Sequence, residues 1–488
     1  MIRKSLSLLL FTCLAAGLFA PAVNAAGPAD QPFLHPLFSD NVVLQRGIQI
    51  PVWGWTEPGK EVTVRLGGRA TTVVADADGK WMAKLNRFRA GGPYTMTVDG
   101  LESVTLTNVM IGDVWLCSGQ SNMEMGVQKA FDPANEVAQA DHPNIRLFTV
   151  PKVIARTPQS TVNGRWLPCS PETIVKGVWG GFSAVGYFFG RDLHRDLGVP
   201  IGLIHSSWGG TPAEAWTSAE GLKTMADFRS AVTQFQEAAA GQTGPVTNNN
   251  PNVTTVLYNG MIAPLIPFGI KGAIWYQGES NASRAKQYRT LLPTMIRDWR
   301  DRFEVGNFPF LIVQLANFQR VKPEPAESSW AELREAQSMT AQNEPNAGLA
   351  IAIDIGNAVD IHPRNKQEVG RRLALTAEAI AYGRHVEYSG PAYRSMKIKG
   401  NMIRLRFDHA KGGLVAKGAK LEGFAIAGSD RHYVWADATI DGSTVIVSSP
   451  KVANPVSVRY AWAENPVCNL YNKADLPASP FRTEEKAP

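Results

Sequence analysis

Cysteine is scarce in this chain, with 4 among 488 residues. Cys13 lies in an N-terminal segment that we expect to be removed, which leaves Cys117, Cys169 and Cys468. Their spacing matches no zinc site, and no pair of histidines is close enough to complete one, so the sequence predicts no bound metal. An oxidising compartment would allow one disulfide, and Cys169–Cys468 is the pair that we expect, because Cys117 lies in a buried strand pattern.

Long hydrophobic runs are absent after residue 26, so no segment of the mature chain is predicted to insert into a membrane. The one earlier run, residues 6–20, follows Arg3 and Lys4 and precedes a small-residue cleavage pattern at 23–25. These are the features of a signal peptide over residues 1–26. We therefore expect an exported protein, either periplasmic or secreted.

An excess of charge of one sign is also absent. The formal net charge is +6, and removal of Arg3 and Lys4 with the signal peptide lowers it to +4. Lys and Arg form no dense block, which argues against a nucleic-acid partner. A hydrophobic fraction of 44% and a charged fraction of 19% are typical of a soluble globular protein.

The chain is long enough for two to four domains. Short alternating strands separated by turns predict a β-sandwich-like domain over residues 27–108. Strand patterns then alternate with helical patterns over 109–384, which predicts an α/β domain whose parallel sheet has helices on both faces. Residues 217–255 within it are predicted to be an insertion with a helix and a loop, and a β pattern returns over 385–488.

The predicted strands of the α/β region are 109–116, 201–205, 270–275, 308–314 and 349–354. Its predicted helices are 184–197, 219–240, 283–303, 329–342 and 365–382. In α/β sheets the chemistry gathers at the carboxyl ends of the strands, so functional residues are sought there.

Ser121 follows the first of these strands. Gly119 breaks the strand pattern, and Ser121, Asn122 and Glu124 begin a helical one. A serine at such a junction can expose its hydroxyl above the sheet edge, close to N–H groups that favour negative charge, as a nucleophile for acyl transfer requires. The alternative interpretation is a helix N-cap, since Ser-Asn-Met-Glu fits a capping pattern.

His362 is the candidate general base. Of 8 histidines, we place only His205 and His362 at strand ends of the α/β region. Asp360 precedes His362 by two residues, on a short stretch where alternate residues share a face, so the pair supplies a base and a group to orient it. Glu279, after the strand 270–275, is a second carboxylate that could orient a histidine or cap the next helix.

Two further clusters offer hydrogen-bond donors. Gly209 and Gly210 follow the strand 201–205, where successive glycines suit an oxyanion hole or, alternatively, a tight turn. Gln277 and Asn281 follow the strand 270–275 and carry side-chain amides that could reach an oxyanion.

Taken together, four segments resemble the sialate O-acetylesterase branch of the SGNH hydrolases, and are similar to bacterial xyloglucan acetylesterases grouped as carbohydrate esterase family 20. They are Gly112-Asp-Val-Trp-Leu-Cys-Ser-Gly-Gln-Ser-Asn-Met-Glu124, Ser206-Ser-Trp-Gly-Gly-Thr211, Trp275-Tyr-Gln-Gly-Glu-Ser-Asn281 and Asp360-Ile-His-Pro-Arg-Asn-Lys366. The resemblance covers nearly the whole mature chain. It implies Ser121 as nucleophile and His362 as general base, with Gly210 and a polar side chain of the third segment joining the Ser121 N–H in the oxyanion hole.

Two departures from the general SGNH pattern leave roles open. The third segment has Gln-Gly-Glu-Ser-Asn where the pattern has Gly-x-Asn-Asp, so either Gln277 or Asn281 is the expected donor. Asp360 and His362 are two residues apart where the pattern has three. We favour Asp360 as the residue that orients His362, whereas in related acetylesterases with a similar Gln-Gly-Glu element the glutamate, here Glu279, has been proposed for that role.

The resemblance implies an exported carbohydrate O-acetylesterase that acts on an O-acetylated oligosaccharide without a cofactor. A sialic acid carboxylate would favour an arginine clamp, whereas neutral plant glycans favour aromatic platforms. The low charge and the tryptophans of the clusters, with Trp208 and Trp275 as expected substrate contacts, favour plant cell-wall oligosaccharides such as xyloglucan. The alternatives are a sialate 9-O-acetylesterase, a lipase-like acyl hydrolase, and a non-catalytic glycan-binding protein.

Overall fold

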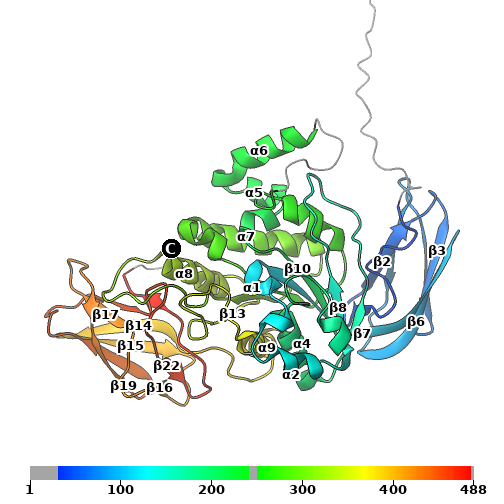
Figure 1. The fold of residues 1–488 in the computed structure, drawn as a ribbon. Helices are drawn as coiled ribbons and strands as arrows, with labels where there is room; N and C mark the ends of the chain where they lie inside the picture. The colour runs from blue at the N-terminus through cyan, green and yellow to red at the C-terminus, as the bar shows by residue number, and fades with distance from the viewer. Residues whose placement is uncertain (1–30, 241–249, 485–488) are drawn as a thin grey trace, which may run out of the picture.

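The computed structural model describes residues 31–240 and 250–484. The predicted signal peptide, residues 1–26, and part of the predicted loop of the insertion, residues 241–249, lie outside the described residues. Within these two ranges, no helix is long and apolar enough to cross a membrane. The described chain has a central α/β layer between an N-terminal and a C-terminal β region (Figure 1).

The central sheet has the order β13-β12-β11-β7-β10-β8-β9. Its strands are β7 (Ser103–Gly119), β8 (His142–Thr149), β9 (Leu167–Cys169), β10 (Ile201–Ser207), β11 (Gly272–Tyr276), β12 (Phe310–Val313) and β13 (Ala347–Ala350). All neighbouring strands pair in parallel except β9, which is antiparallel to β8. The predicted α/β class is confirmed, with further antiparallel sheets beside the central one.

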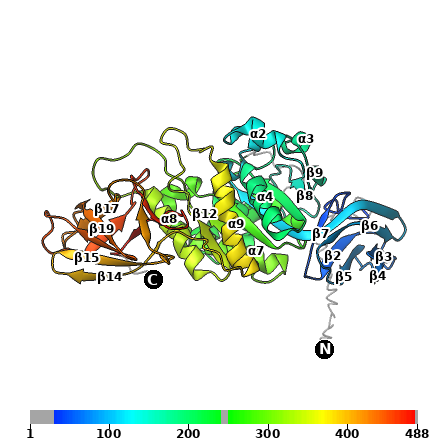
Figure 2. The same cartoon turned by 90° about the horizontal axis from the view of Figure 1, so that it is seen from below.

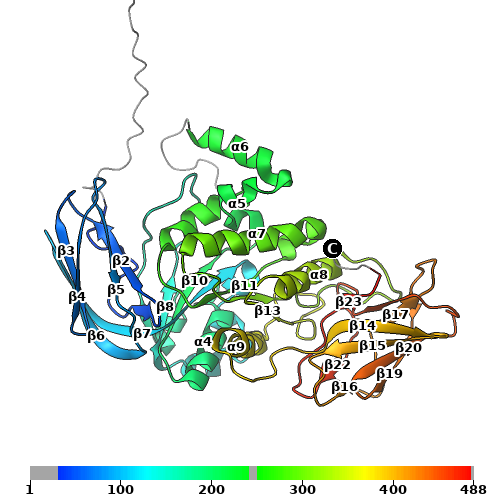
Figure 3. The ribbon, with the colours of Figure 1, turned by 180° about the vertical axis from the view of Figure 1, so that it is seen from behind.

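Helices cover both faces of this sheet. Helices α4 (Ala184–Leu197) and α9 (Lys366–Tyr382) lie together on one face (Figure 2), and α7 (Ala285–Phe303) and α8 (Ser329–Asn343) lie on the other (Figure 3). Side chains of β7 alternate between the two cores, with Val114 and Leu116 in one and Trp115 and Cys117 in the other. Successive residues of a strand point to opposite faces of the sheet. Because both faces are buried here, successive residues are all hydrophobic, and the strands form continuous hydrophobic runs in the sequence.

The N-terminal region packs two small sheets against each other. Its strands are β1 (Val43–Gln45), β2 (Ile50–Trp55), β3 (Glu61–Leu66), β4 (Arg69–Val74), β5 (Lys80–Leu85) and β6 (Gly91–Asp99). Strands β2 and β5 form a pair, while β4, β3 and β6 lead to β7. Strand β7 runs without a break across the predicted boundary between residues 108 and 109, so one strand belongs to both regions.

The C-terminal region is a sandwich of antiparallel sheets. One sheet has the order β14-β15-β20-β19 and another the order β18-β17-β21-β23, with a separate pair β16-β22. The bounds are β14 (Ala392–Lys399), β15 (Met402–Asp408), β16 (Leu414–Ala416), β17 (Phe424–Ala427), β18 (Val434–Trp435), β19 (Asp437–Asp441), β20 (Thr444–Ser448), β21 (Ser457–Tyr460), β22 (Leu470–Asn472) and β23 (Phe481–Arg482). Ile351 and Ile353, just after β13, pack into its core and join it to the α/β layer.

Further helices, most of them short, lie in the connections. They are α1 (Ser121–Glu124), η2 (Val127–Lys129), α2 (Pro133–Ala138), α3 (Pro171–Ile174), η3 (Ala213–Trp216), α5 (Ala219–Lys223), α6 (Ala226–Ala240), η4 (Tyr258–Ile262), η5 (Ala263–Leu265) and η6 (Glu279–Arg284). The insertion predicted for 217–255 contains α5 and α6, and α6 projects away from the sheet (Figure 1). The predicted strand 349–354 instead ends at Ala350, after which the chain leaves the sheet towards the C-terminal region.

The predicted disulfide Cys169–Cys468 is wrong, because the three described cysteines are free thiols. Cys169 ends β9 at the edge of the central sheet, and its Sγ donates to Ala140 O at 3.3 Å. Cys468 lies in the C-terminal region, where it contacts the Tyr460 hydroxyl. Burial raises the pKa of each of these two thiols to about 12, so both stay protonated.

Candidate active site

Ser121 is the first residue of α1, at the carboxyl end of β7. Gly119 has φ 140°, and a Cβ there would lie 2.2 Å from the backbone oxygen of Tyr276, so only glycine allows the chain to turn at this point. Gln120, not Ser121, is the N-cap residue, and no side chain caps the helix. The helix-cap interpretation of Ser121 is therefore wrong. Its side chain is partly exposed, and its hydroxyl makes no hydrogen bond to any described residue.

Gly209 and Gly210 lie beside Ser121 on the loop that follows β10. A Cβ on Gly209 would lie 3.3 Å from the Cβ of Ser121, and its N–H donates to Glu124 Oε2 at 2.6 Å. Gly210 has φ 75°, and a Cβ added to it would meet no atom within 4 Å. Within the described ranges the N–H groups of Gly210 and Ser121 have no protein acceptor, so both remain available to a developing oxyanion.

His362 and Asp360 lie together on the loop between β13 and α9. The Asp360 Oδ1 atom accepts the backbone N–H of His362 at 2.9 Å and lies 3.4 Å from His362 Nδ1. Desolvation lowers the pKa of His362; Asp360 opposes this shift and the Lys366 cation adds to it. The imidazole is therefore mostly neutral near pH 7, the form that a general base needs.

The other strand-end histidine, His205, is buried beneath the sheet edge. Its Nε2 contacts Ser207 Oγ at 2.6 Å, and its ring packs on Phe182. Desolvation lowers the pKa of His205 to about 4. His205 is thus hidden from solvent on β10, whereas His362 lies on a loop and is partly exposed, and His362 stays the predicted base.

Asn122 connects three of the four predicted clusters. Its Nδ2 donates to Glu279 Oε1 at 2.6 Å and to the backbone oxygen of Ile361 at 3.0 Å. Its Oδ1 accepts from Lys366 Nζ at 2.6 Å. The residue after Ser121 is thus bonded to the residue before His362, which brings the candidate nucleophile and base to the same place.

Glu279 is part of this buried network and contacts Asn122 rather than His362. Its Oε2 atom is buried without a partner among the residues of the two described ranges. Burial raises the pKa of Glu279, against the opposing effects of Asn122 and Lys366. Burial likewise lowers the pKa of Lys366 to about 7. Asp360 is therefore the carboxylate seen beside His362, while Glu279 holds Asn122.

Gln277 and Asn281 are fully buried, and their amides serve the neighbouring loop. Gln277 Nε2 donates to Thr211 O at 3.2 Å and to Asn281 Oδ1 at 2.6 Å, which uses both of its hydrogens. Asn281 Nδ2 donates to Glu214 Oε2 at 2.9 Å, and its Oδ1 accepts the Ala213 N–H at 2.9 Å. Their predicted role as oxyanion donors stays a prediction, and in this conformation Gln277 has no hydrogen left for it.

The tryptophans expected to contact substrate differ in position. Trp275 is 0% exposed and packs against Trp216 and Trp299 in the core, so it lacks the surface position that a substrate contact requires. Trp208 is partly exposed beside Gly209, and the Lys152 ammonium lies 5.1 Å from its ring centroid. Trp208 therefore keeps the exposure that the prediction needs.

Three residues at the site were not identified from the sequence: Asn122 and Lys366 as parts of the buried network, and Trp179. The ring of Trp179 is 37% exposed and meets His362 edge to face, with 4.9 Å between centroids. It stands among Gly177, Gly180 and Gly181, all with positive φ. A tryptophan within a glycine-rich loop is the signal that could have drawn attention to it. No group of His, Cys, Asp and Glu in the described part of the chain could hold a metal ion.

Comparisons with known proteins identify the family of this chain. Residues 111–378 match the family model described as carbohydrate esterase, sialic acid-specific acetylesterase. The sialate O-acetylesterases of Pongo abelii and Homo sapiens are 33% and 32% identical to this chain, each over 92% of both sequences. A carbohydrate acetylesterase from Xanthomonas citri has a solved structure that matches with TM-score 0.84 and 43% identity, over 93% of this chain and 100% of that one. The chain therefore belongs to the sialic acid-specific acetylesterase family of carbohydrate esterases, and it is a carboxylic ester hydrolase for O-acetylated carbohydrate.

Proposed function

We propose that this acetylesterase is exported and removes acetyl groups from neutral plant cell-wall oligosaccharides such as xyloglucan, with Ser121 as nucleophile and His362 as general base. The observation that carries the catalytic part is the Asn122–Ile361 hydrogen bond, which joins the Ser121 and His362 loops beside two free N–H groups. Export is proposed from the signal-peptide pattern of residues 1–26.

In the proposed reaction, Ser121 Oγ attacks the acetyl carbonyl carbon while His362 takes the hydroxyl proton. The N–H groups of Ser121 and Gly210 stabilise the oxyanion. The C–O bond to the sugar then breaks, and His362 returns the proton to the departing sugar oxygen. Water attacks the acetyl-serine ester with His362 as base, which releases acetate and restores Ser121. Asp360 accepts the Nδ1 hydrogen of His362 and leaves Nε2 free for these transfers.

The charges around the site support a neutral substrate. Lys152 pairs with Glu124 at 2.5 Å, and Lys366 is fully buried on Asn122. Arg364 donates to the backbone oxygens of Lys129 and Ala130 at 3.2 and 2.9 Å. These three cations are thus engaged within the protein, whereas a sialate carboxylate would favour a free bidentate arginine. The site offers the partly exposed aromatic surfaces of Trp179 and Trp208 instead of a free arginine.

A sialate 9-O-acetylesterase is the second candidate, because the curated relatives at 32–33% identity carry that name. A non-catalytic glycan-binding protein is disfavoured by the free Ser121 hydroxyl and the neutral His362. One experiment separates the candidates: acetate release from acetylated xyloglucan, acetylated xylan and 9-O-acetyl sialic acid, measured in parallel with wild type and Ser121→Ala. We expect the highest kcat/KM on xyloglucan and none above background for Ser121→Ala. A preference for 9-O-acetyl sialic acid would overturn the substrate proposal, and an active Ser121→Ala would overturn the nucleophile.

A further inference from the structure

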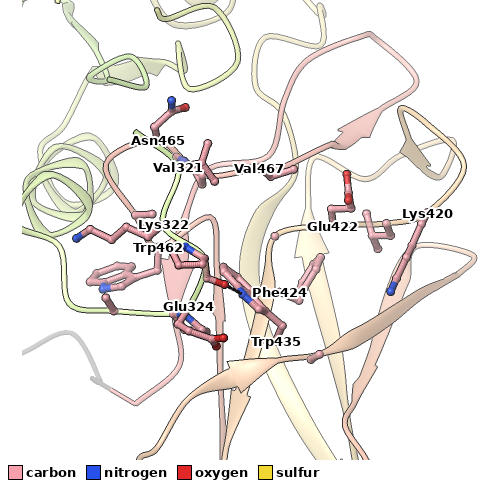
Figure 4. A pocket seen from close by; sticks show the side chains of 18 residues that line it. Val321, Lys322, Glu324, Lys420, Glu422, Phe424, Trp435, Trp462, Asn465 and Val467 are labelled. Carbon is pink, nitrogen blue, oxygen red and sulfur yellow. Dashed lines mark hydrogen bonds between the residues drawn. The ribbon is translucent and has the colours of Figure 1, made fainter. Parts of the chain in front are cut away.

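A pocket of about 370 Å³ lies apart from the candidate active site, between the α/β layer and the C-terminal region (Figure 4). One wall is the loop segment 321–326, which belongs to the connection between β12 and α8. The other wall is formed by the segment 420–424, which leads into β17, by Trp435 of β18 with Ala436, and by the loop 462–467. Its volume lies within the range of about 300–1,000 Å³ that is usual for small-molecule sites.

Trp435 is the main aromatic surface of this pocket. Its side chain is 45% exposed, yet its Nε1 donates to the backbone oxygen of Pro323 at 2.6 Å. In Figure 4 it lies next to Phe424, with Val321 and Val467 on another side of the pocket. The hydrogen bond fixes the indole before any ligand arrives, so stacking on it costs little side-chain entropy.

The charges of the lining disfavour an anion. Lys322 pairs with Glu464 at 2.9 Å, and Lys420 pairs with Asp437 at 3.2 Å. Glu324 and Glu422 also line the pocket, and neither forms an ion pair within the described chain. A rim with engaged cations and two unpaired carboxylates repels a negative ligand and accepts hydroxyl donors.

Hydrogen bonds connect the pocket to the loop that carries Asp360 and His362. Asn465 lines the pocket, and its Oδ1 accepts from Asn317 Nδ2 at 2.8 Å. The Oδ1 of Asn317 accepts the Gly356 N–H at 2.6 Å, and Phe318 pairs with Asn357. The connection leaves the carboxyl end of β12, which is the sheet edge where Ser121 also lies. An oligosaccharide held at the active site could therefore also contact this pocket, because both lie at the same edge of the central sheet.

We propose that this pocket, centred on Trp435, binds a neutral pyranose unit of the acetylated glycan at a distance from the acetyl group. The inference rests on the proposed function, since it names the polymer held while Ser121 acts on its acetyl ester. A neutral sugar is recognised by an aromatic face and by acceptors for its hydroxyls. This lining offers a fixed and exposed indole face and hydroxyl acceptors, and its described residues include no free cation. The carboxylate of a sialic acid unit would find no unpaired cation among the described residues of this lining.

Binding is tested by ¹⁹F NMR on the 5-fluorotryptophan-labelled full chain, titrated with a xyloglucan heptasaccharide that carries no acetyl group. The spectrum of Trp435→Phe assigns the resonance. We expect the Trp435 signal to shift saturably with the heptasaccharide and to stay fixed with free N-acetylneuraminic acid, which has a carboxylate and no neutral pyranose unit. An unmoved Trp435 signal overturns the pocket, and an equal response to N-acetylneuraminic acid overturns its neutral preference.

Kinetics provide the second test. Trp435→Ala should raise KM for acetylated xyloglucan oligosaccharides roughly tenfold, the scale of one lost aromatic contact, with kcat unchanged. Hydrolysis of p-nitrophenyl acetate, which is too small to span both sites, should not change. Val321→Arg should act in the same direction, because a long cationic side chain at this exposed position of the lining would occupy the pocket and pair with the carboxylates that accept sugar hydroxyls. Ile398→Ala on β14 is the matched control, since Ile398 is 47% exposed and outside the pocket.

The two proposals fail in different ways. An unchanged KM in both pocket variants would remove the pocket and leave the acetylesterase proposal intact. An enzyme that releases no acetate from xyloglucan would contradict the proposed substrate, and the NMR titration with the unacetylated heptasaccharide would still report on the pocket.

Discussion

The side chain of Asn122 donates to the backbone oxygen of Ile361 at 3.0 Å, so the residue after Ser121 is bonded to the residue before His362. The two loops are more than two hundred residues apart in the sequence. The same Asn122 amide donates to Glu279 and accepts from Lys366; Asn122 and Lys366 are buried and Glu279 is half-buried. Removal of the Asn122 side chain should therefore change the position of Ser121, the proposed nucleophile, relative to His362, the proposed base.

Asn122→Ala tests that relationship. The variant leaves half-buried Glu279 and buried Lys366 without their common partner, which should cost about 1–3 kcal/mol in the free energy of unfolding. Misplacement of Ser121 relative to His362 should lower kcat by roughly 10²-fold, with a small change in KM. Urea unfolding and steady-state kinetics on p-nitrophenyl acetate measure the two effects. Asn135→Ala, at an exposed position of α2, is the control, and a wild-type kcat in Asn122→Ala would contradict the prediction.

The pH dependence of kcat/KM should report His362. A base must be neutral, and desolvation lowers the pKa of His362 below its ordinary value of 6.5. Activity should therefore rise with pH through a midpoint below 6.5 and then stay level. Asp360 acts to raise this pKa, so Asp360→Asn should move the midpoint to lower pH and reduce kcat by roughly 10²–10⁴-fold.

Glu279→Gln is the companion variant, because it removes the charge and retains an acceptor for Asn122. We expect the acid midpoint to change less than in Asp360→Asn, since Glu279 contacts Asn122 and not His362. The reverse order of effects, with Glu279→Gln the more damaging variant, would assign the orienting role to Glu279.

We expect Gln277 to contribute to the stability of the folded protein rather than to catalysis. Both hydrogens of its amide are used by Thr211 and Asn281, and Tyr288 donates to its Oε1 at 2.8 Å. Gln277→Ala should lower the free energy of unfolding by about 1–3 kcal/mol, while an oxyanion donor would show a loss of roughly 10²–10³ in kcat. Thermal unfolding and kcat per folded molecule separate the two. A selective loss of kcat at full stability would restore Gln277 to the oxyanion hole, and Gln234→Ala on exposed α6 controls for loss of an amide.

Lys366 should make the free energy of unfolding depend on pH. Its pKa is about 7 in the folded protein, against about 10.4 in an unfolded chain. Between these values the unfolded state binds more protons, so this group makes the folded state more stable as pH rises. Lys366→Met should remove that contribution, of up to about 1.4 kcal/mol per pH unit. Urea unfolding at several pH values measures the slope, with exposed Lys411→Met as control; equal slopes in wild type and Lys366→Met would refute the assignment.

The elements of the α/β layer were predictable because their patterns are local. Helix α4 has the predicted bounds, and α7, α8 and α9 differ from prediction by one or two residues at an end. Strand β7 could not be predicted in full from local patterns. Nothing in residues 103–119 separates the part that pairs in the N-terminal region from the part that pairs in the central sheet. Pairing partners are remote in sequence, so a single strand shared by two regions appears only in the folded molecule.

The sequence by itself determined the parallel α/β layer and the strand-end position of Ser121, because hydrophobic periodicity is a local property, and it supplied His362 as the proposed base from its neighbour at position i−2. Only the tertiary structure decided that Trp275 is buried, that the cysteines stay apart, and that Asp360 rather than Glu279 lies beside His362. It also decided that Asn122 and Lys366 join the two loops. Those outcomes depend on which side of a packed layer each side chain faces and on what fills the space beside it, and that is set by contacts between segments far apart in the chain.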